Sequence, residues 1–253
     1  MPTYLHDAQT PREPDPETGL PIGPRVTPGG PARRPERVVL DGRYCRLEPL
    51  EADRHADELF LASTPPDAVA RFQYLPVAAP ATRADFDAWV ASSATAVDRL
   101  YFAVVDKRSG AVAGRQSLMR IDPANRSIEI GDIYWGPAIA RSPVTTEANF
   151  LFARYAFDTL GYWRYEWKCN ALNGPSRQSA ERFGFTYEGL FRRSTIVRGR
   201  TRDTTWFAMI AEEWPALRTA YETWLAPENF DGHGGQRQRL SDLTRAALAE
   251  TRR

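Results

Sequence analysis

One stretch, residues 128–160, constrains the fold more than any other part of the chain. An apolar run ends at Tyr134 and Trp135, a short loop covers residues 136–141, and a helix then begins at Ser142-Pro143. Serine at the N-cap and proline at the first helical position form a strong start signal, because the hydroxyl accepts a backbone N–H and proline has none to satisfy. The pattern predicts a strand, a loop and a helix in direct succession.

The start of this helix is a candidate anion site. We expect the backbone N–H groups of Val144, Thr145 and Thr146 to lack intrahelical acceptors, at the positive end of the helix dipole and directly after Arg141. A helix terminus of this kind binds phosphate or carboxylate groups. A capped helix without a ligand is the alternative at this stage.

The bulk composition excludes several classes of protein. The 253 residues include 33 basic and 32 acidic ones, so a net charge of +1 gives no field that gathers nucleic acid or an anionic membrane. The 2 cysteines and 3 histidines are scattered, which argues against a disulfide framework or a metal site. The N-terminus lacks a signal-peptide pattern, and no apolar run reaches the roughly 18 residues that span a bilayer. We expect a metal-free, soluble, cytoplasmic protein.

The chain divides into three parts. Residues 1–37 are rich in proline, which disfavours regular structure and predicts an extended arm. Residues 38–225 carry the alternating and helical apolar spacings of a single α/β domain. Residues 226–253 are polar and predict a tail with at most a frayed helix. The arm and the last helix of the domain are candidate surfaces for a homodimer.

Within the domain, apolar periodicity predicts an ordered series of strands and helices. We expect strands in 38–50, 101–106, 111–121, 128–135, 163–169, 185–197 and 203–210, and helices in 51–62, 82–97, 142–160, 173–184 and 212–225.

This order, together with local sequence strings, resembles the GNAT superfamily of N-acetyltransferases. The strings are most similar to its ribosomal-protein N-terminal acetyltransferase (RimJ/RimL-like) branch. They include Ile128-Glu129-Ile130-Gly131, Thr146-Glu147-Ala148, Leu160-Gly161-Tyr162, Asn173 with Ser176-Arg177, and Arg182-Phe183-Gly184-Phe185. The resemblance implies an α/β fold with a mixed, mostly antiparallel central sheet flanked by helices on both faces.

The resemblance also implies a chemistry, the direct transfer of an acetyl group from acetyl-CoA, as co-substrate, to a primary amine. The acceptor would be a small molecule or a protein N-terminus. The near-neutral net charge already argued against a membrane or nucleic-acid partner. The splayed fourth and fifth strands would hold the pantetheine, and the helix start would hold the diphosphate. The implied cofactor-binding residues are Ile133, Tyr134, Trp135, Arg141, Ser142, Val144, Thr145, Thr146, Asn173, Arg177 and Arg182.

The chain departs from the superfamily pattern in two places. Pro143 and Thr145 stand where the acyl-CoA loop usually carries glycines, and Pro143 has no N–H to offer a phosphate. We expect Arg141 and the hydroxyls of Ser142, Thr145 and Thr146 to compensate. The usual acid tyrosine is replaced by Ala180, so Ser176, which matches a serine of the ribosomal branch, is the best remaining acid.

Two carboxylates are candidate proton acceptors for the amine. In a regular strand Glu129 and Asp132 point to opposite faces, so only one of them reaches a given cleft. A bulge beside the cleft would change that parity. Asp132, Glu129, and transfer without any protein base remain alternatives, and a structural ion pair is the other role open to Glu129.

Several other candidates have a structural alternative. Phe72, Tyr74 and Trp135 are candidate acceptor-pocket residues or simply core aromatics. Asn173 and Ser176 also fit the N-cap and first turn of a helix. Arg177 and Arg182 also fit solvated positions on the protein surface. The arginines of the last hairpin, at 192, 193, 198, 200 and 202, would attract an acidic acceptor or ribosomal RNA, or would simply form a solvated hairpin tip. A GNAT-like protein that binds acyl-CoA without transfer is the competing function.

Overall fold

The computed structural model describes residues 11–26 and 30–251, and the chain separates into two compact units, residues 1–31 and 32–253. In the first unit, strands β1 (Glu13–Pro14) and β2 (Pro21–Ile22) pair antiparallel. The expectation that this segment lacks regular structure is wrong, because residues other than proline supply the hydrogen bonds that hold the strand pair together. The Asp15 N–H donates to the Leu20 carbonyl at 2.8 Å, and the Asp15 carboxylate accepts from Thr18.

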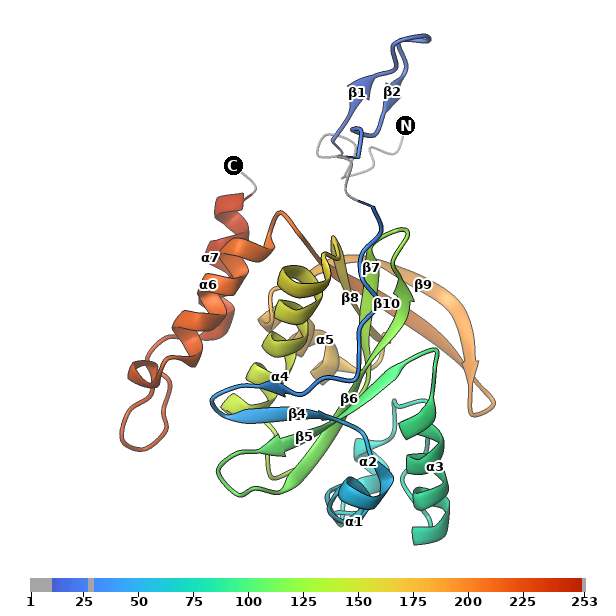
Figure 1. The fold of residues 1–253 in the computed structure, drawn as a ribbon, viewed down its shortest axis with the longest axis vertical. Coiled ribbons are helices and arrows are strands. Elements are labelled where there is room, and N and C mark those ends of the chain that lie inside the picture. The colour runs from blue at the N-terminus through green and yellow to red at the C-terminus, as the bar shows by residue number, and fades with distance from the viewer. Residues whose placement is uncertain (1–10, 27–29, 252–253) are drawn as a thin grey trace. The chain divides into compact units, whose positions relative to one another are not determined.

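The second unit is built on one eight-stranded sheet, ordered β3-β4-β5-β6-β7-β8-β10-β9 (Figure 1). Its strands are β3 (Leu40–Asp41), β4 (Cys45–Pro49), β5 (Leu100–Asp106), β6 (Val112–Asp122), β7 (Ser127–Trp135), β8 (Arg164–Asn170), β9 (Thr186–Val197) and β10 (Arg200–Ile210). Every adjacent pair is antiparallel except β7 and β8, which are parallel. The predicted mixed, mostly antiparallel sheet is confirmed.

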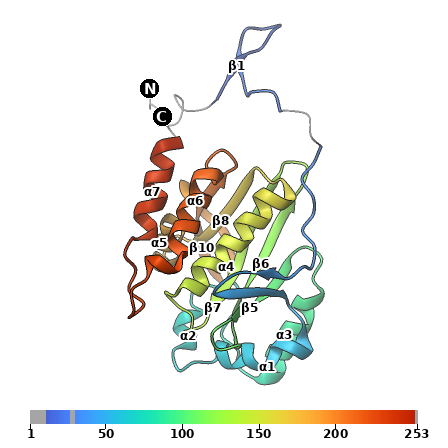
Figure 2. The same cartoon turned by 60° about the vertical axis from the view of Figure 1, so that its left-hand side comes forward.

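Helices cover both faces of this sheet, as expected (Figure 2). They are α1 (Ala52–Ser63), α2 (Ala68–Arg71), α3 (Arg83–Thr95), α4 (Pro143–Arg154), a π-helical turn (Tyr155–Leu160), α5 (Gly174–Arg182), α6 (Trp214–Leu225), a 3₁₀ turn (Pro227–Asn229) and α7 (Leu240–Thr251). The side of α4 and α6 holds the larger core, which includes Phe102, Phe152 and Tyr221. The side of α1 and α3 holds a smaller core around Leu59, Phe86 and Val90.

The C-terminal segment differs from the predicted polar tail. Helix α7 packs beside α6 and buries Leu240, Thr244 and Ala247 against the main core. The Thr244 hydroxyl donates to the Arg182 carbonyl at 3.2 Å. A short helix is marginal by itself, so this one owes its order to packing against α6 and the main core. The N-terminal boundary differs too, because Ala32 and Arg33 donate backbone bonds to Pro123 and Leu160 and so belong to the main unit.

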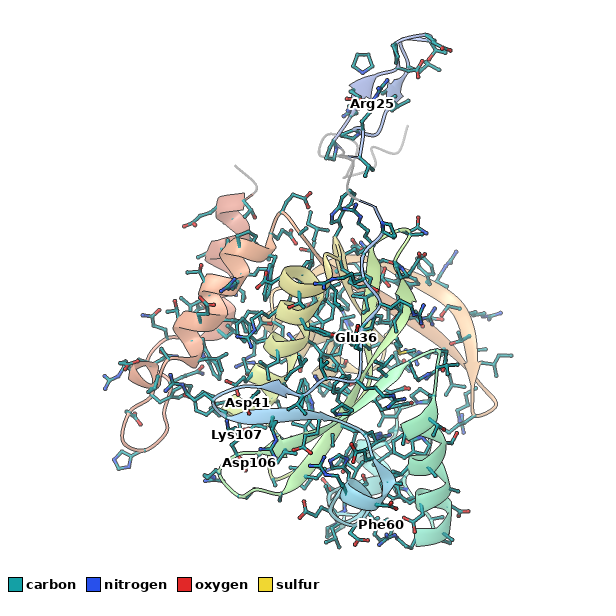
Figure 3. All side chains as sticks on the ribbon, viewed as in Figure 1. Arg25, Glu36, Asp41, Phe60, Asp106 and Lys107 are labelled. Carbon is teal, nitrogen blue, oxygen red and sulfur yellow. The ribbon has the colours of Figure 1, made fainter. Side chains whose placement is uncertain are left out.

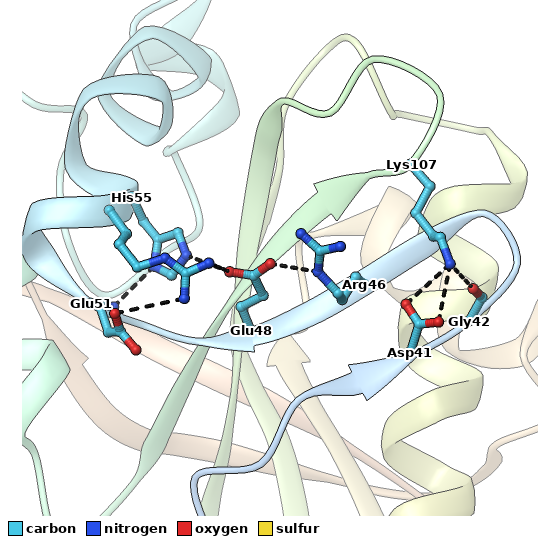
Figure 4. A network of polar contacts seen from close by, with 8 residues as sticks. Asp41, Gly42, Arg46, Glu48, Glu51, His55 and Lys107 are labelled. Carbon is cyan, nitrogen blue, oxygen red and sulfur yellow. Dashed lines mark hydrogen bonds and ion pairs between the residues drawn. The ribbon is translucent and has the colours of Figure 1, made fainter.

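A buried carboxylate joins α4 to the turn between β3 and β4. Glu147 accepts the backbone N–H groups of Arg43, Tyr44 and Cys45 at 2.7, 2.6 and 2.7 Å. At the same turn, Lys107 lies against Asp41 (Figure 3) and donates to both Asp41 and the Gly42 carbonyl (Figure 4). These bonds fix the position of α4 relative to the sheet edge.

Figure 4 also shows a second network, centred on Glu48 at the end of β4. The Glu48 carboxylate contacts Arg46 at 2.5 Å, Arg54 at 2.6 Å and the His55 ring at 3.1 Å. The His55 Nδ1 accepts the N–H of Glu51 at the start of α1, at 3.0 Å. The network therefore ties the beginning of α1 to the sheet.

Candidate active site

The two parallel strands separate halfway along their length. Their pairing runs from Ser127 opposite Arg164 to Ile130 opposite Trp167 and then stops. Beyond it β7 pairs only with β6, and β8 pairs only with β10. Both sides of the resulting gap line a cleft of about 950 Å³, which we call the central cleft. Such a volume suits a ligand-binding site.

A β-bulge at this point brings the two candidate carboxylates together. Gly131 lies opposite Ser117 and Tyr134 opposite Arg115, so β7 carries one more residue than β6 between these pairs. Asp132 adopts a left-handed φ of 48° there. The extra residue reverses the alternation, so that both Glu129 and Asp132 line the central cleft. The bulge that the sequence left open is present.

Each of these carboxylates is held by other side chains. Asp132 Oδ2 accepts from Arg99 at 2.8 Å and from the Tyr101 hydroxyl at 2.6 Å. Burial raises the pKa of Tyr101 to about 12, aided by the charge of Asp132, so this hydroxyl keeps its proton at neutral pH.

Glu129 is buried, and its Oε2 forms ion pairs with Lys168 Nζ at 3.0 Å and with Arg120 Nε at 2.9 Å. Burial raises the pKa of Glu129 above its ordinary value, although the charges of Lys168 and Arg120 oppose the shift. The structural ion pair that the sequence offered as an alternative is therefore present, in a residue that also lines the cleft.

Ser176 and Asn173 begin helix α5 at the wall of the central cleft. The Asn173 side chain caps the helix by accepting the Ser176 N–H at 3.1 Å. The Ser176 hydroxyl oxygen accepts from Trp167 Nε1 at 3.1 Å. Since that bond uses a lone pair of the oxygen, the hydroxyl hydrogen stays available to a group in the cleft.

The start of α4 has fewer donors than the sequence suggested. Ser142 is the N-cap residue, but its hydroxyl donates to the Ile139 carbonyl at 2.6 Å instead of accepting a helix N–H. Thr145 donates its hydroxyl to the Ser142 carbonyl at 3.1 Å. With Ser142 as N-cap, helix geometry gives the Thr146 N–H an intrahelical acceptor and leaves only the N–H groups of Val144 and Thr145. The expected cap by the Ser142 hydroxyl is therefore wrong, and the hydroxyls of Ser142 and Thr145 donate to carbonyls of the chain itself.

Arg141, Ser142 and Thr145 line the central cleft beside these N–H groups, and Arg141 is exposed with a φ of 59°. Arg182 also lines it, donates to the Thr146 hydroxyl at 3.0 Å, and lies over the Trp224 ring. Burial lowers the pKa of the Arg182 guanidinium.

Five sequence candidates lie outside the lining of the central cleft, for different reasons. Phe72 is buried against Tyr134, with ring centroids 4.5 Å apart, which contradicts its place in an acceptor pocket. The Tyr134 hydroxyl donates to the Ala62 carbonyl, away from the cleft. Arg177 is exposed on α5, whereas Val144 and Thr146 lie buried in α4. The other acceptor candidates, Tyr74 and Trp135, and the strand residue Ile133 do line the cleft.

Sequence reasoning missed part of the wall. Lining residues that were not singled out as site residues come from α2 and the loop after it, from β6, from β8 and β10, and from the loop before α7, although residues 61–82 and 192–202 were expected as segments to form the acceptor pocket. They include Arg71, Met119, Lys168, Asn170, Arg202, Phe230, Gly234 and Gln236. Arg202 could have been found from the sequence, since it belongs to the cluster of hairpin arginines. The loop after α6 was not considered as part of a site, because the region was predicted to be a polar tail.

Within residues 11–26 and 30–251, no group of three or more histidine, cysteine, aspartate or glutamate side chains gathers in a way that would hold a metal ion. No helix of the described chain has the length and apolar character needed to cross a membrane.

A parallel strand pair that opens beside a helix N-terminus, with carboxylates and a serine in the gap, fits an enzyme that acts on an extended anionic ligand. The model of the GNAT acetyltransferase domain matches residues 45–186. The chain belongs to this family of N-acetyltransferases.

Relatives agree with this assignment. A GCN5-related N-acetyltransferase from Brucella melitensis is 57% identical, with a TM-score of 0.85, and the match covers 86% of this chain and 98% of that one. YdaF of Bacillus subtilis, provisionally named a ribosomal N-acetyltransferase, is 32% identical over 106 residues, which are 42% of this chain and little more than half, 57%, of that protein.

The fold also extends to more distant enzymes. The microcin C7 self-immunity acetyltransferase MccE, in a structure with acetyl-CoA and AMP, is 23% identical with a TM-score of 0.59, and the match covers 67% of this chain and 93% of that one. At this identity the likeness concerns the fold.

Proposed function

We propose that this protein transfers an acetyl group from acetyl-CoA directly to a primary amine, on a protein N-terminus or a small molecule, in the central cleft. The observation that carries the proposal is the bulge of β7, which places two carboxylates in the gap between the parallel strands. The name of YdaF supports a ribosomal protein as acceptor, and the match to the GNAT acetyltransferase domain supports acetyl-CoA as donor.

The chain has suitable groups for acetyl-CoA. The edge of β7 beyond Ile130 has no strand partner on the side of β8, so backbone groups of Ile133 to Trp135 are available to an extended ligand. The N–H group of Thr145 and the guanidinium of Arg141, both in the lining of the cleft, form the phosphate-binding part. Acetyl-CoA would supply a thioester carbonyl and a thiol leaving group.

The carboxylates divide the work on the amine. Asp132, fixed by Arg99 and Tyr101, attracts the ammonium form of the acceptor into the cleft. Glu129 then accepts the ammonium proton, which frees the nitrogen lone pair for attack. Burial raises the pKa of Glu129 above its ordinary value, which makes its carboxylate a stronger proton acceptor.

Ser176 serves the departing sulfur. Its hydroxyl oxygen accepts the Trp167 indole N–H, so its hydrogen can be donated to the sulfur as the carbon–sulfur bond breaks, while the serine oxygen takes up the remaining proton from the nitrogen of the tetrahedral intermediate. Ser176 would thus take the role of the acid tyrosine that is usual in the superfamily. The position of that tyrosine is occupied here by Ala180, which is buried in the core.

The proposal is tested by incubating the protein with acetyl-CoA and a panel of amines, including free N-terminal peptides, polyamines, amino acids and aminoglycosides, while thiol release is followed. We expect release with at least one amine. Binding of CoA without release for any amine would favour the competing function, a protein that binds acyl-CoA without transfer.

The proton acceptor is tested by pH profiles of kcat/KM. Glu129→Gln should lower kcat on the order of 10²-fold and remove the acid limb, because the group that must lose its proton is gone. Asp132→Asn should mainly raise KM for the amine and keep the limb. Full kcat in both variants would rule out both carboxylates.

The phosphate assignment depends on Arg141. Arg141→Ala should weaken CoA binding about tenfold, or about 1.4 kcal/mol, measured by calorimetry. Arg177→Ala is the matched control, because Arg177 is an exposed arginine outside the cleft and should leave the affinity unchanged. Equal affinities for wild type and Arg141→Ala would refute the assignment even though the fold is that of the family.

A further inference from the structure

The positively charged side chains around the central cleft are satisfied in different ways. Lys168 pairs with Glu129 and Glu166, at 3.0 and 2.6 Å. Arg71 pairs with Asp67 at 2.8 Å. Arg202, like Arg141 and Arg182 in the same lining, has no carboxylate among the described residues within 4.0 Å of its guanidinium. Its Nε is also buried without a hydrogen-bond partner.

An unpaired, partly buried guanidinium is unfavourable unless something offsets its lost hydration. Burial lowers the pKa of Arg202, while the charges of Glu129 and Asp132 act on it from nearby. Arg115 is a useful comparison, since it also has unpartnered nitrogens. It lies 4.1 Å from the centroid of the Trp89 ring, which offsets part of the cost. Arg202 has no such ring among the described residues.

Arg202 also occupies a junction. A second cleft of about 410 Å³, which we call the side cleft, lies between the loop 73–75 and the β9–β10 hairpin. Four residues line both clefts, namely Tyr74, Leu75, Asn170 and Arg202. Across the side cleft, Arg198 donates to the Gln73 carbonyl at 2.5 Å and holds the loop against the hairpin. The two clefts therefore share a wall at Arg202.

We infer that Arg202 binds an anionic group, a carboxylate or a phosphate, carried by the amine acceptor and directed toward the side cleft. This inference rests on the proposed function, in which Glu129 and Asp132 receive the amine. A guanidinium supplies charge-assisted bonds to either anion. Arg200, an exposed residue that also lines the side cleft, adds positive charge there. The acceptor thus carries opposite charges at its two ends.

The test compares matched acceptors that differ in one anion. One pair is the amidated peptide Ser-Glu-Ala-Ala and its Ser-Gln-Ala-Ala counterpart, and the other is O-phosphoethanolamine and ethanolamine. In wild type we expect kcat/KM to favour the anionic member of at least one pair tenfold or more. Preference in the peptide pair identifies an acidic polypeptide, and preference in the second pair a small phosphorylated amine.

The variants locate the effect. Arg202→Gln should reduce the preference for the anionic member to less than twofold, whereas Arg192→Gln, a control on the exposed face of the same hairpin, should keep it. Equal rates within both pairs in wild type overturn the inference, even if Arg202→Gln does not fold. A preference that survives in folded Arg202→Gln overturns it as well.

Binding separates this inference from the proposed function. Calorimetric titration of the same four compounds into the protein without acetyl-CoA requires no turnover. If no amine is acetylated, the proposed function fails, while tighter binding of an anionic compound that is lost in Arg202→Gln still supports the anion site. If amines are acetylated but neither rate nor affinity depends on the anion, only the present inference fails.

Discussion

The contact between Gly42 and Glu147 allows a sharp test of what positions helix α4. A Cβ added at Gly42 would overlap the Glu147 carboxylate, both its carbon and Oε2. The carboxylate is not free to move aside, because it accepts three backbone N–H groups. Gly42→Ala should therefore break this set of hydrogen bonds although none of the residues that form it is substituted.

The size of the effect follows from the burial of the three donors. Cys45 is buried, Tyr44 half-buried and Arg43 exposed, so water replaces the carboxylate readily only at Arg43. A buried donor left unsatisfied costs about 1–3 kcal/mol. We expect Gly42→Ala to lower the free energy of unfolding by about 2 kcal/mol, and Glu147→Ala by about 3 kcal/mol, because Glu147→Ala removes the acceptor altogether.

Urea unfolding followed by circular dichroism measures both single variants and the double variant. In the Glu147→Ala background the overlap is gone, so adding Gly42→Ala should cost less than about 0.5 kcal/mol. Exposed Glu181→Ala on α5 controls for the loss of a glutamate. If Gly42→Ala costs the same in both backgrounds, the effect arises from the turn itself and the reasoning is wrong.

Three further predictions concern other parts of the chain. Burial opposes the ionisation of Glu48, but His55, Arg46 and Arg54 outweigh it and lower the pKa of Glu48 in the folded state. The network therefore stabilises the folded protein fully at pH values above the ordinary pKa of 4.5. This stabilisation is lost as the pH falls through the lowered pKa. The difference in unfolding free energy between wild type and Glu48→Gln should therefore shrink from pH 7 to pH 4. Ser176→Ala should lower kcat on the order of 10²-fold and leave CoA affinity within twofold, measured by thiol release and calorimetry. Leu240→Ala should cost about 2–4 kcal/mol in urea unfolding, whereas Leu61→Ala at an exposed site should cost less than about 0.5 kcal/mol.

The regular elements were largely predictable because their signals are local. Thr82 was expected to begin a helix, and its side chain accepts the Asp85 N–H as the N-cap of α3. Gly161 was expected to end one, and it adopts the left-handed conformation after the π-helical turn. Side-chain periodicity and turn chemistry reside in neighbouring residues, so one sequence suffices to find them.

The site was predictable only in part, since its geometry depends on contacts between distant segments. Glu129 and Asp132 were singled out, but which face each occupies depended on a bulge set by pairing with β6. Ser142 has the sequence of an N-cap, yet its hydroxyl finds the Ile139 carbonyl instead. The choice between two hydrogen bonds of similar strength depends on the loop conformation, which residue types do not specify.

Helix α7 has a consequence for the order in which the enzyme is completed. The ribosome makes the whole sheet before it makes residues 226–251, which supply part of the cleft wall and the last layer over α6. Until these residues emerge, the nascent chain leaves an apolar surface of α6 uncovered, a surface to which chaperones bind. Part of the wall of the central cleft would then be among the last features of the main unit to form.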